Sequence, residues 1–317
     1  MTRSHRWTAA DIPDQTGRTF LVTGANAGIG LATTGALTAR GAKVIMACRN
    51  LDKAEAARAT LPAAARELTQ VRELDLADLE SVESLVADIA ARAAEPADPG
   101  LAPADRPFER IDVLINNAGV MNIPHARTAQ GHEMQFGVNV LGHHALTAGL
   151  VPHLTDRVVW LGSLAHLWGR IETDDLSMER RGYRPLGAYG HSKLACIMLA
   201  YEWQRRFERE GSTLRSVAAH PGYTATELIR QSGRPLADRF FELGNSIPGA
   251  GLTPEQGALP VLHAATVPDI SGGAFVGPDK LGGLRGHPQI TRSTRRSHDQ
   301  AVAADLWQRC TDMVAFR

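Results

Sequence analysis

A glycine-rich turn at residues 23–30 constrains the fold of this chain more than any other feature. Its sequence, TGANAGIG, joins a short apolar run, Thr19–Val22, to a helix-like stretch, Ile29–Arg40. Glycines there let the backbone bend sharply and approach a pyrophosphate, whose charge the unpaired N–H groups of a helix N-terminus bind. The spacing is GxxxGxG and not the commoner GxGxxG, and an ordinary turn is the alternative in a chain with 30 glycines. The position after the first strand favours a dinucleotide site built from Gly24, Asn26, Ala27, Gly28, Ile29 and Gly30.

Apolar runs rich in β-branched residues alternate with longer helical patterns along the chain. The runs lack polar alternation, as strands that are buried on both faces do. Repeated strand–helix alternation predicts a single-domain Rossmann-type α/β fold, a doubly wound parallel sheet with helices on both faces. The predicted strands are Thr19–Val22, Lys43–Ala47, Gln70–Leu74, Ile111–Ile115, Arg157–Leu161 and Leu214–Ala219, and the predicted helices include Ile29–Arg40, Asp78–Ala94 and Ala188–Glu210.

The whole chain, residues 1–317, is predicted to be one domain. Its core is expected at 16–283, followed by a C-terminal tail, 284–317, in which Ser297–Val314 forms a terminal helix.

Two stretches interrupt the strand–helix pattern. Ala94–Arg110 is rich in Pro, Ala and Asp and is predicted to be a mobile surface loop. Residues 223–251 are predicted to form a substrate lid, because Arg230–Gly251 mixes turn residues with an amphipathic segment.

Composition narrows the class of partner. Lys+Arg and Asp+Glu number 34 each, so charge gives no reason to expect nucleic acid or an anionic membrane as a partner. No apolar run approaches the ~18 residues that span a bilayer, and Met1–Gln15 lacks the apolar stretch of a secretory signal. Three distant cysteines predict reduced thiols in a cytoplasmic protein. No metal site is expected, because the clustered histidines lack ligand partners at suitable spacing; they are His143, His144, His166 and His191.

The ends of the second and third predicted strands bear on the choice of cofactor. NAD requires a carboxylate after the second strand for its ribose 2′-hydroxyl, whereas NADP requires a cation for its 2′-phosphate. Arg49 and Asn50 stand there and no acid does, which favours NADP(H) over NAD(H). Asp75, with Leu76 beside it, follows the third strand and is predicted to accept from the adenine amino group; a turn or capping aspartate is the alternative.

Tyr189 and Lys193 are spaced four residues apart in a predicted helix, so their side chains share one face. A tyrosine hydroxyl with an ordinary pKa near 10 is a poor acid–base catalyst at neutral pH, and a nearby ammonium favours its phenolate. Ser163 ends the buried strand Arg157–Leu161 and can donate to a carbonyl oxygen. No GxSxG elbow surrounds it, so nucleophilic acyl chemistry is not predicted.

These residues together resemble the short-chain dehydrogenase/reductase family, from about Thr16 to Gly283. Several segments, among them HSKLA at 191–195 and HPG at 220–222, are similar to the retinol-dehydrogenase-like branch and its bacterial relatives. The family's motifs are matched in order by the glycine turn, Asp75, Asn116-Asn117-Ala118-Gly119, Asn139, Ser163, Tyr189 with Lys193, and Pro221-Gly222.

The resemblance implies a catalytic tetrad of Asn139, Ser163, Tyr189 and Lys193. Tyr189 would protonate the carbonyl oxygen in reduction, and Lys193 would assist it and hold the nicotinamide ribose. Ser163 would orient the carbonyl, and Asn139 would hold a proton-relay water. The remaining cofactor contacts implied are Asn117, Ala118 and Gly119 near the ribose and nicotinamide, and Pro221, Gly222, Thr224 and Thr226 at the carboxamide.

The sequence departs from the family pattern at two points near the site. Gly162 precedes Ser163 where the branch usually has a second serine, and Leu167–Leu186 lengthens the segment before Tyr189. That insert is expected to border the substrate entrance and to obstruct helix pairing, so monomer and homodimer both stay open.

The favoured function is an NADP(H)-dependent carbonyl reductase or alcohol dehydrogenase for a hydrophobic small molecule. An extended-branch sugar-nucleotide epimerase or dehydratase is one alternative, although its glycine spacing is normally GxxGxxG. A catalytically silent NADP(H)-sensing regulator is another, although such proteins usually lose the Tyr or the Lys.

Overall fold

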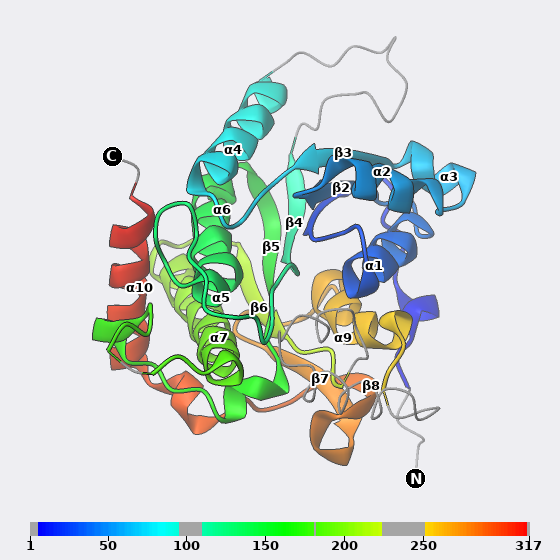
Figure 1. Cartoon of the computed structure of the whole chain (residues 1–317). Coiled ribbons are helices and arrows are strands. Elements are labelled where there is room, and N and C mark those ends of the chain that lie inside the picture. The colour runs from blue at the N-terminus through cyan, green and yellow to red at the C-terminus, as the bar shows by residue number, and fades with distance from the viewer. Residues whose placement is uncertain (1–5, 95–109, 181, 224–250, 316–317) are drawn as a thin grey trace.

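The computed structural model describes residues 6–94, 110–180, 182–223 and 251–315. In these residues eight strands form one sheet in the order β3-β2-β1-β4-β5-β6-β7-β8 (Figure 1). Neighbouring strands are parallel, except that β8 runs antiparallel to β7. The strands are β1 (Thr19–Thr23), β2 (Lys43–Cys48), β3 (Thr69–Glu73), β4 (Ile111–Asn116), β5 (Leu154–Leu161), β6 (Arg215–Ala219), β7 (Phe275–Lys280) and β8 (Arg285–Ile290).

The six strands predicted from apolar runs are all present, and β7 and β8 are two that the sequence did not reveal. Both extra strands carry a proline, Pro278 or Pro288, and the last two residues of each are exposed. Proline is tolerated at sheet edges but breaks the apolar pattern that marks a buried strand. The sheet therefore continues beyond Gly283, where the core was expected to end.

Side chains alternate between the two faces of the sheet, as the two-residue period of a strand requires. In β1, Leu21 joins one apolar core and its neighbours Phe20 and Val22 join the other. The first core includes Leu85, Leu146 and Leu306, whereas the second includes Leu37 and Val261. Because the strands are buried on both faces, they could be predicted from continuous apolar runs in the sequence.

Helices cover both faces (Figure 1). On one face lie α1 (Gly28–Thr38), α2 (Leu51–Ala59), α3 (Ala63–Glu67) and α9 (Pro254–Thr266). On the other lie α4 (Leu79–Ala94), α5 (Met134–Phe136), α6 (Gly142–Leu150) and α7 (Pro185–Arg209), with α10 (Gln300–Val314) outside them. A π-helical turn, Gly137–Leu141, joins α5 to α6. The predicted helices are thus confirmed as α1, α4, α7 and α10, with ends shifted by a few residues.

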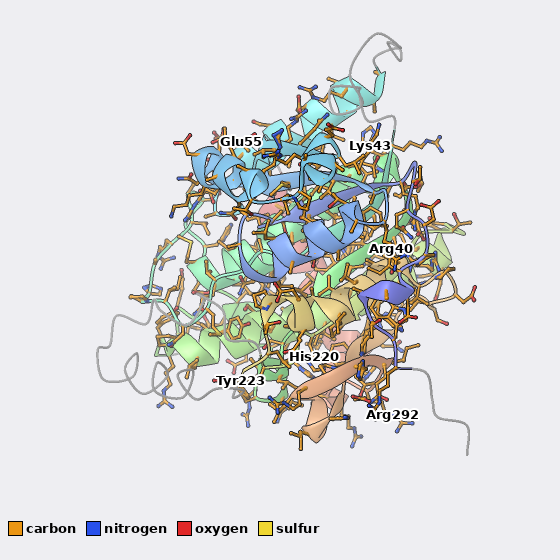
Figure 2. The ribbon with its side chains drawn as sticks, turned by 90° about the vertical axis from the view of Figure 1, so that its right-hand side faces the viewer. Arg40, Lys43, Glu55, His220, Tyr223 and Arg292 are labelled. Carbon is orange, nitrogen blue, oxygen red and sulfur yellow. The ribbon has the colours of Figure 1, made fainter. Side chains whose placement is uncertain are left out.

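Because the first seven strands are parallel, their carboxyl ends share one edge of the sheet, where ligands of open α/β folds bind. In Figure 2, Tyr223 marks this edge, because it follows the carboxyl end of β6. Arg40 and Lys43 mark the opposite edge, where β2 begins, and lie well away from Tyr223. Among the helices that the structure describes, none has both the length and the apolarity to cross a bilayer.

Candidate active site

The glycine turn leaves β1 at this edge and is closely packed. Gly24 and Gly28 adopt φ values of +65° and +51°, which L side chains rarely adopt. A Cβ on Gly30 would lie 2.3 Å from the Gly24 carbonyl oxygen and 2.7 Å from Asn117 Nδ2. Gly30 therefore lets α1 approach the turn directly.

Helix α1 begins without a side-chain cap. Its N-cap residue is Ala27, which makes no capping hydrogen bond, and the first turn carries no acidic residue. The N–H groups of this turn and the positive end of the helix dipole suit an anion. A pyrophosphate fits this cradle, which a side chain at Gly30 would fill.

Thr23 and the segment after β4 hold each other in place. The Thr23 Oγ1 accepts from the backbone N–H groups of Asn117 and Ala118, each at 2.9 Å. Asn117 Nδ2 donates back to the Thr23 carbonyl at 2.8 Å, and Asn116 Nδ2 donates to Thr147 Oγ1 at 3.0 Å. The two asparagines therefore brace this edge of the sheet.

Arg49 and Asn50 follow β2 and differ in what they do. Arg49 is exposed, and no described residue makes a hydrogen bond or ion pair with its side chain. Asn50 caps α2, its Oδ1 accepting from the Lys53 N–H at 2.8 Å. Burial raises the pKa of the neighbouring Cys48 thiol to about 11, despite the Ala25 and Asn26 amides that hydrogen-bond to it. Cys48 is therefore a neutral thiol beside the glycine turn.

Asp75 follows β3 and shapes a turn. Its Oδ1 accepts from the Ala77 N–H at 2.9 Å, and its own N–H donates to Ser81 Oγ at 2.9 Å. Asp75 is therefore a turn aspartate, and none of the residues that the structure describes donates to its Oδ2. Leu76 beside it is buried, and its carbonyl oxygen packs against Gly142.

Asn139 lies in the π-helical turn and is buried. Its Oδ1 accepts from the Val120 N–H at 2.8 Å, and its Nδ2 donates to the Val120 carbonyl at 3.0 Å and to Ser192 Oγ at 2.9 Å. Ser192 Oγ in turn donates to the Tyr189 carbonyl at 2.9 Å. Asn139 is thereby tied both to the segment after β4 and to helix α7.

Tyr189 and Lys193 lie on α7 as the four-residue spacing predicted. The Lys193 Nζ donates to the Leu161 carbonyl at 2.9 Å and lies 5.9 Å from the centre of the Tyr189 ring. Lys193 is only 5% exposed, whereas Tyr189 is half-buried. A Cβ on Gly119 would lie 3.1 Å from Asn139 Oδ1 and 3.6 Å from Lys193 Nζ, so its absence leaves space between these two polar groups.

Ser163 caps a short 3₁₀ helix, Leu164–Leu167, two residues beyond the carbonyl that holds Lys193. Its Oγ accepts from the Ala165 N–H at 3.2 Å, which directs its own proton elsewhere. His166 Nδ1 lies 2.5 Å from the Ser163 carbonyl, and burial lowers the pKa of this imidazole. The serine is thus fixed at the end of β5.

Gly222 turns the chain after β6 with a φ of +80°. Tyr223, which follows it, donates its N–H to the Leu284 carbonyl at 2.9 Å. Pro221 and Gly222 therefore lie at the same sheet edge as the other motifs. Thr224, Thr226 and the predicted lid between Tyr223 and Gly251 lie outside the described residues, as do residues 95–109 of the predicted surface loop.

The structure places the predicted residues that it describes beyond the carboxyl ends of six strands, β1 to β6, in the π-helical turn and on helix α7. It also reveals three that sequence reasoning did not assign to the site: Thr23, Ser192 and His143. A polar residue that ends an apolar strand, as Thr23 does, was the available signal for the first. Nothing in the sequence indicated which atoms the other two contact.

Comparison with known proteins places the chain in a family. The family model described as short chain dehydrogenase matches residues 18–236. Human retinol dehydrogenase 13 is 37% identical over 95% of this chain and 85% of its own length, and human retinol dehydrogenase 11 is 38% identical over 95% and 86%.

Solved structures agree in fold. That of an uncharacterized protein from Mycobacterium paratuberculosis is 41% identical, with a TM-score of 0.78 over 98% of each chain. A short chain dehydrogenase from Shigella flexneri, complexed with NADP, is 22% identical, with a TM-score of 0.59 over 83% of this chain and 97% of its own. The chain therefore belongs to the short-chain dehydrogenase/reductase family, is similar to the retinol dehydrogenases within it, and is an oxidoreductase that acts on alcohol and carbonyl groups.

Proposed function

We propose that this chain is an NADP(H)-dependent enzyme that interconverts a ketone or aldehyde and its alcohol, with Tyr189 as the general acid and base. One observation carries the proposal: a buried ammonium, Lys193, is held by the Leu161 carbonyl beside the half-buried ring of Tyr189. When bound, the nicotinamide supplies or accepts the hydride.

Tyr189 gives its proton to the carbonyl oxygen in reduction and takes a proton from the alcohol in the reverse direction. The Lys193 ammonium stabilises the phenolate that remains. It uses one N–H for Leu161, and two are left for the nicotinamide ribose and for a water. Ser163 donates to the substrate oxygen and so orients it for proton transfer.

Asn139 holds the water that returns a proton to this site. Its Oδ1 accepts from the Val120 N–H with one lone pair, and its second lone pair can accept from a water. The space at Gly119 lies between that oxygen and Lys193 Nζ. In the proposal, a water bound to this oxygen also hydrogen-bonds to Lys193 Nζ.

NADP(H) is the proposed cofactor because Arg49 is exposed at the end of β2, where the chain has no carboxylate. Its planar guanidinium suits the 2′-phosphate. The other proposed contacts are the glycine turn at the pyrophosphate, Asp75 and Leu76 at the adenine, Asn117, Ala118 and Gly119 at the ribose and nicotinamide, and Pro221, Gly222, Thr224 and Thr226 at the carboxamide.

The proposed substrate is a hydrophobic carbonyl compound or alcohol. Two observations support this: the retinol dehydrogenase relatives are named for an apolar alcohol, and apolar side chains stand near the catalytic strand ends, including Leu164 and Val120. We also propose a cytoplasmic location, since Cys48, Cys196 and Cys310 are buried free thiols. Glycine spacing argues against the epimerase, and the presence of Tyr189 with Lys193 argues against a silent regulator.

The test is cofactor absorbance at 340 nm with a panel of ketones and aldehydes that includes retinal. We expect consumption of NADPH with at least one apolar carbonyl compound. Binding of NADPH without turnover of any panel member would instead favour the regulator. Conversion of a nucleotide sugar without net loss of NADPH would favour the epimerase.

A further inference from the structure

The imidazole of His143 lies between Thr23, at the start of the glycine turn, and Asn139. This side chain is 1% exposed and projects from α6. Its Nε2 lies 2.9 Å from Thr23 Oγ1, and its Nδ1 lies 3.0 Å from the Asn139 carbonyl oxygen. One ring therefore contacts the end of β1 and the π-helical turn at once.

The surrounding groups fix where the proton of the ring lies. A carbonyl oxygen only accepts, so Nδ1 carries the proton and donates it to Asn139. Thr23 Oγ1 already accepts from two backbone N–H groups, those of Asn117 and Ala118, so its own proton points outward. His143 Nε2 at 2.9 Å receives it in preference to the Ile115 carbonyl at 3.4 Å.

Burial keeps this ring neutral: it lowers the pKa of His143 to about 3, although the hydrogen bond that the ring donates to the Asn139 carbonyl acts in the opposite direction. Protonation would place an N–H against a hydroxyl whose lone pairs are both used. The ring is thus held in a single tautomer throughout the neutral pH range.

The same path continues to the proposed general acid. Asn139 Nδ2 donates to Ser192 Oγ, which donates to the Tyr189 carbonyl, both at 2.9 Å. Hydrogen bonds therefore run from the amides of Asn117 and Ala118 to the backbone carbonyl of Asn139, and from the side-chain amide of Asn139 to the backbone of Tyr189; the covalent frame of Asn139 joins the two parts.

We infer that His143 is a positioning residue that couples the cofactor-binding turn to the Asn139–Tyr189 part of the site. The inference rests on the proposed function, because its two ends are the proposed cofactor and proton-transfer groups. The contact with Thr23 fixes the segment Asn117–Gly119, which would line the ribose and nicotinamide. The Asn139 side fixes the asparagine and, through Ser192, the turn of α7 that carries Tyr189.

His144 is a matched control on the same helix. It is also 1% exposed, and burial also lowers its pKa to about 3. It points elsewhere: its Nε2 lies 3.3 Å from Thr311 Oγ1, and its ring packs at 4.7 Å and 5.7 Å from the rings of Trp307 and Trp203. Loss of a buried imidazole as such should affect His143 and His144 variants alike.

The test separates the two contacts of His143. An asparagine side chain ends near the position of Nδ1 and can donate to the Asn139 carbonyl, whereas a glutamine side chain reaches the position of Nε2 and can accept from Thr23. His143→Asn should raise the Kd of NADPH about fivefold to a hundredfold and leave kcat at saturating cofactor within threefold of wild type. His143→Gln should show the reverse, a lowered kcat with a Kd near the wild-type value.

Cofactor fluorescence gives Kd, steady-state kinetics give kcat, and Tm reports folding. His143→Leu should change both Kd and kcat, whereas His144→Leu and His144→Gln should lower Tm and leave both Kd and kcat within threefold of wild type.

If His143→Leu does not fold, His143→Asn and His143→Gln still test the inference. Equal Kd and kcat values in wild type and both of those variants would overturn the inference, and so would identical losses in the two. Failure of the wild type to bind NADPH or turn over any substrate would instead contradict the proposed function itself.

Discussion

The ammonium of Lys193 donates to the backbone carbonyl of Leu161 across 2.9 Å, and this bond ties helix α7 to the end of strand β5. The position of the charge beside Tyr189 is therefore set by backbone and does not depend on a flexible partner. Ser163 follows the same carbonyl by two residues, so one strand end orients both the cation and the proposed carbonyl-binding hydroxyl.

Replacement of Lys193 tests whether its charge assists catalysis, separately from its effect on stability. Lys193→Met keeps the length of the stem and removes the charge, so kcat should fall at least about a hundredfold because the phenolate loses its stabilising ion. Tm should hold or rise, since burying an ammonium is costly. Kinetics and thermal unfolding measure the two quantities. Lys43→Met, at the opposite edge of the sheet (Figure 2), should leave kcat unchanged; equal effects of the two substitutions would refute the role.

The glycine turn should reject a single methyl group. Gly30→Ala places a carbon 2.3 Å from the Gly24 carbonyl oxygen, so the turn must shift, and NADPH affinity should fall at least tenfold. Titration of cofactor fluorescence measures this. Gly35→Ala on the same helix meets Leu61 Cδ2 at an ordinary 3.6 Å and should be neutral or stabilise by up to about 1 kcal/mol. Wild-type affinity in Gly30→Ala would contradict the pyrophosphate site.

Cofactor preference should depend on Arg49. A charge-assisted bond to a 2′-phosphate contributes about 1.5–3 kcal/mol, so even one such bond corresponds to a preference for NADPH of roughly tenfold or more in kcat/KM, mainly through KM. Arg49→Ala should remove most of this gap and leave NADH kinetics nearly unchanged, and Arg49→Asp should favour NADH.

An exposed arginine on α3, Arg66, provides the control for that experiment. Arg66→Ala should keep the wild-type NADPH/NADH ratio, which excludes a general effect of surface charge. An unaltered ratio in Arg49→Ala would mean that the phosphate is held elsewhere. Asn26 would then be the next residue to test, because the side chain of Asn50 already caps α2.

The sequence predicted the strands that are buried on both faces, because such strands are continuous apolar runs. It did not predict β7 and β8, the last two strands of the sheet, where glycine, proline and charged residues replace that pattern. Tyr189 and Lys193 were found from helical spacing alone, since a four-residue interval fixes a shared face. The bonds of His143 could not be found in this way. They depend on the π-helical turn that carries Asn139 and on the register of β1 against β4.

Stability should decline in mild acid because buried histidines must ionise on unfolding. The pKa of His144 is about 3 in the folded state and near 6.5 when unfolded, so the unfolded chain binds more protons between these values. The contribution of His144 to stability is thus complete above about pH 6.5 and is lost as pH falls. His144→Phe should lose about 2 kcal/mol less than wild type between pH 7 and pH 5 in denaturant titrations. Parallel losses in the two proteins would contradict the neutral buried imidazole.

The most direct measurement is the turnover of Tyr189→Phe at saturating NADPH, with cofactor affinity determined on the same preparation. The substitution removes one hydroxyl from a half-buried ring, so the protein should fold and bind NADPH with wild-type affinity. Without the general acid, kcat should fall by at least about a hundredfold. Retention of more than a tenth of the wild-type kcat would show that another group protonates the carbonyl oxygen.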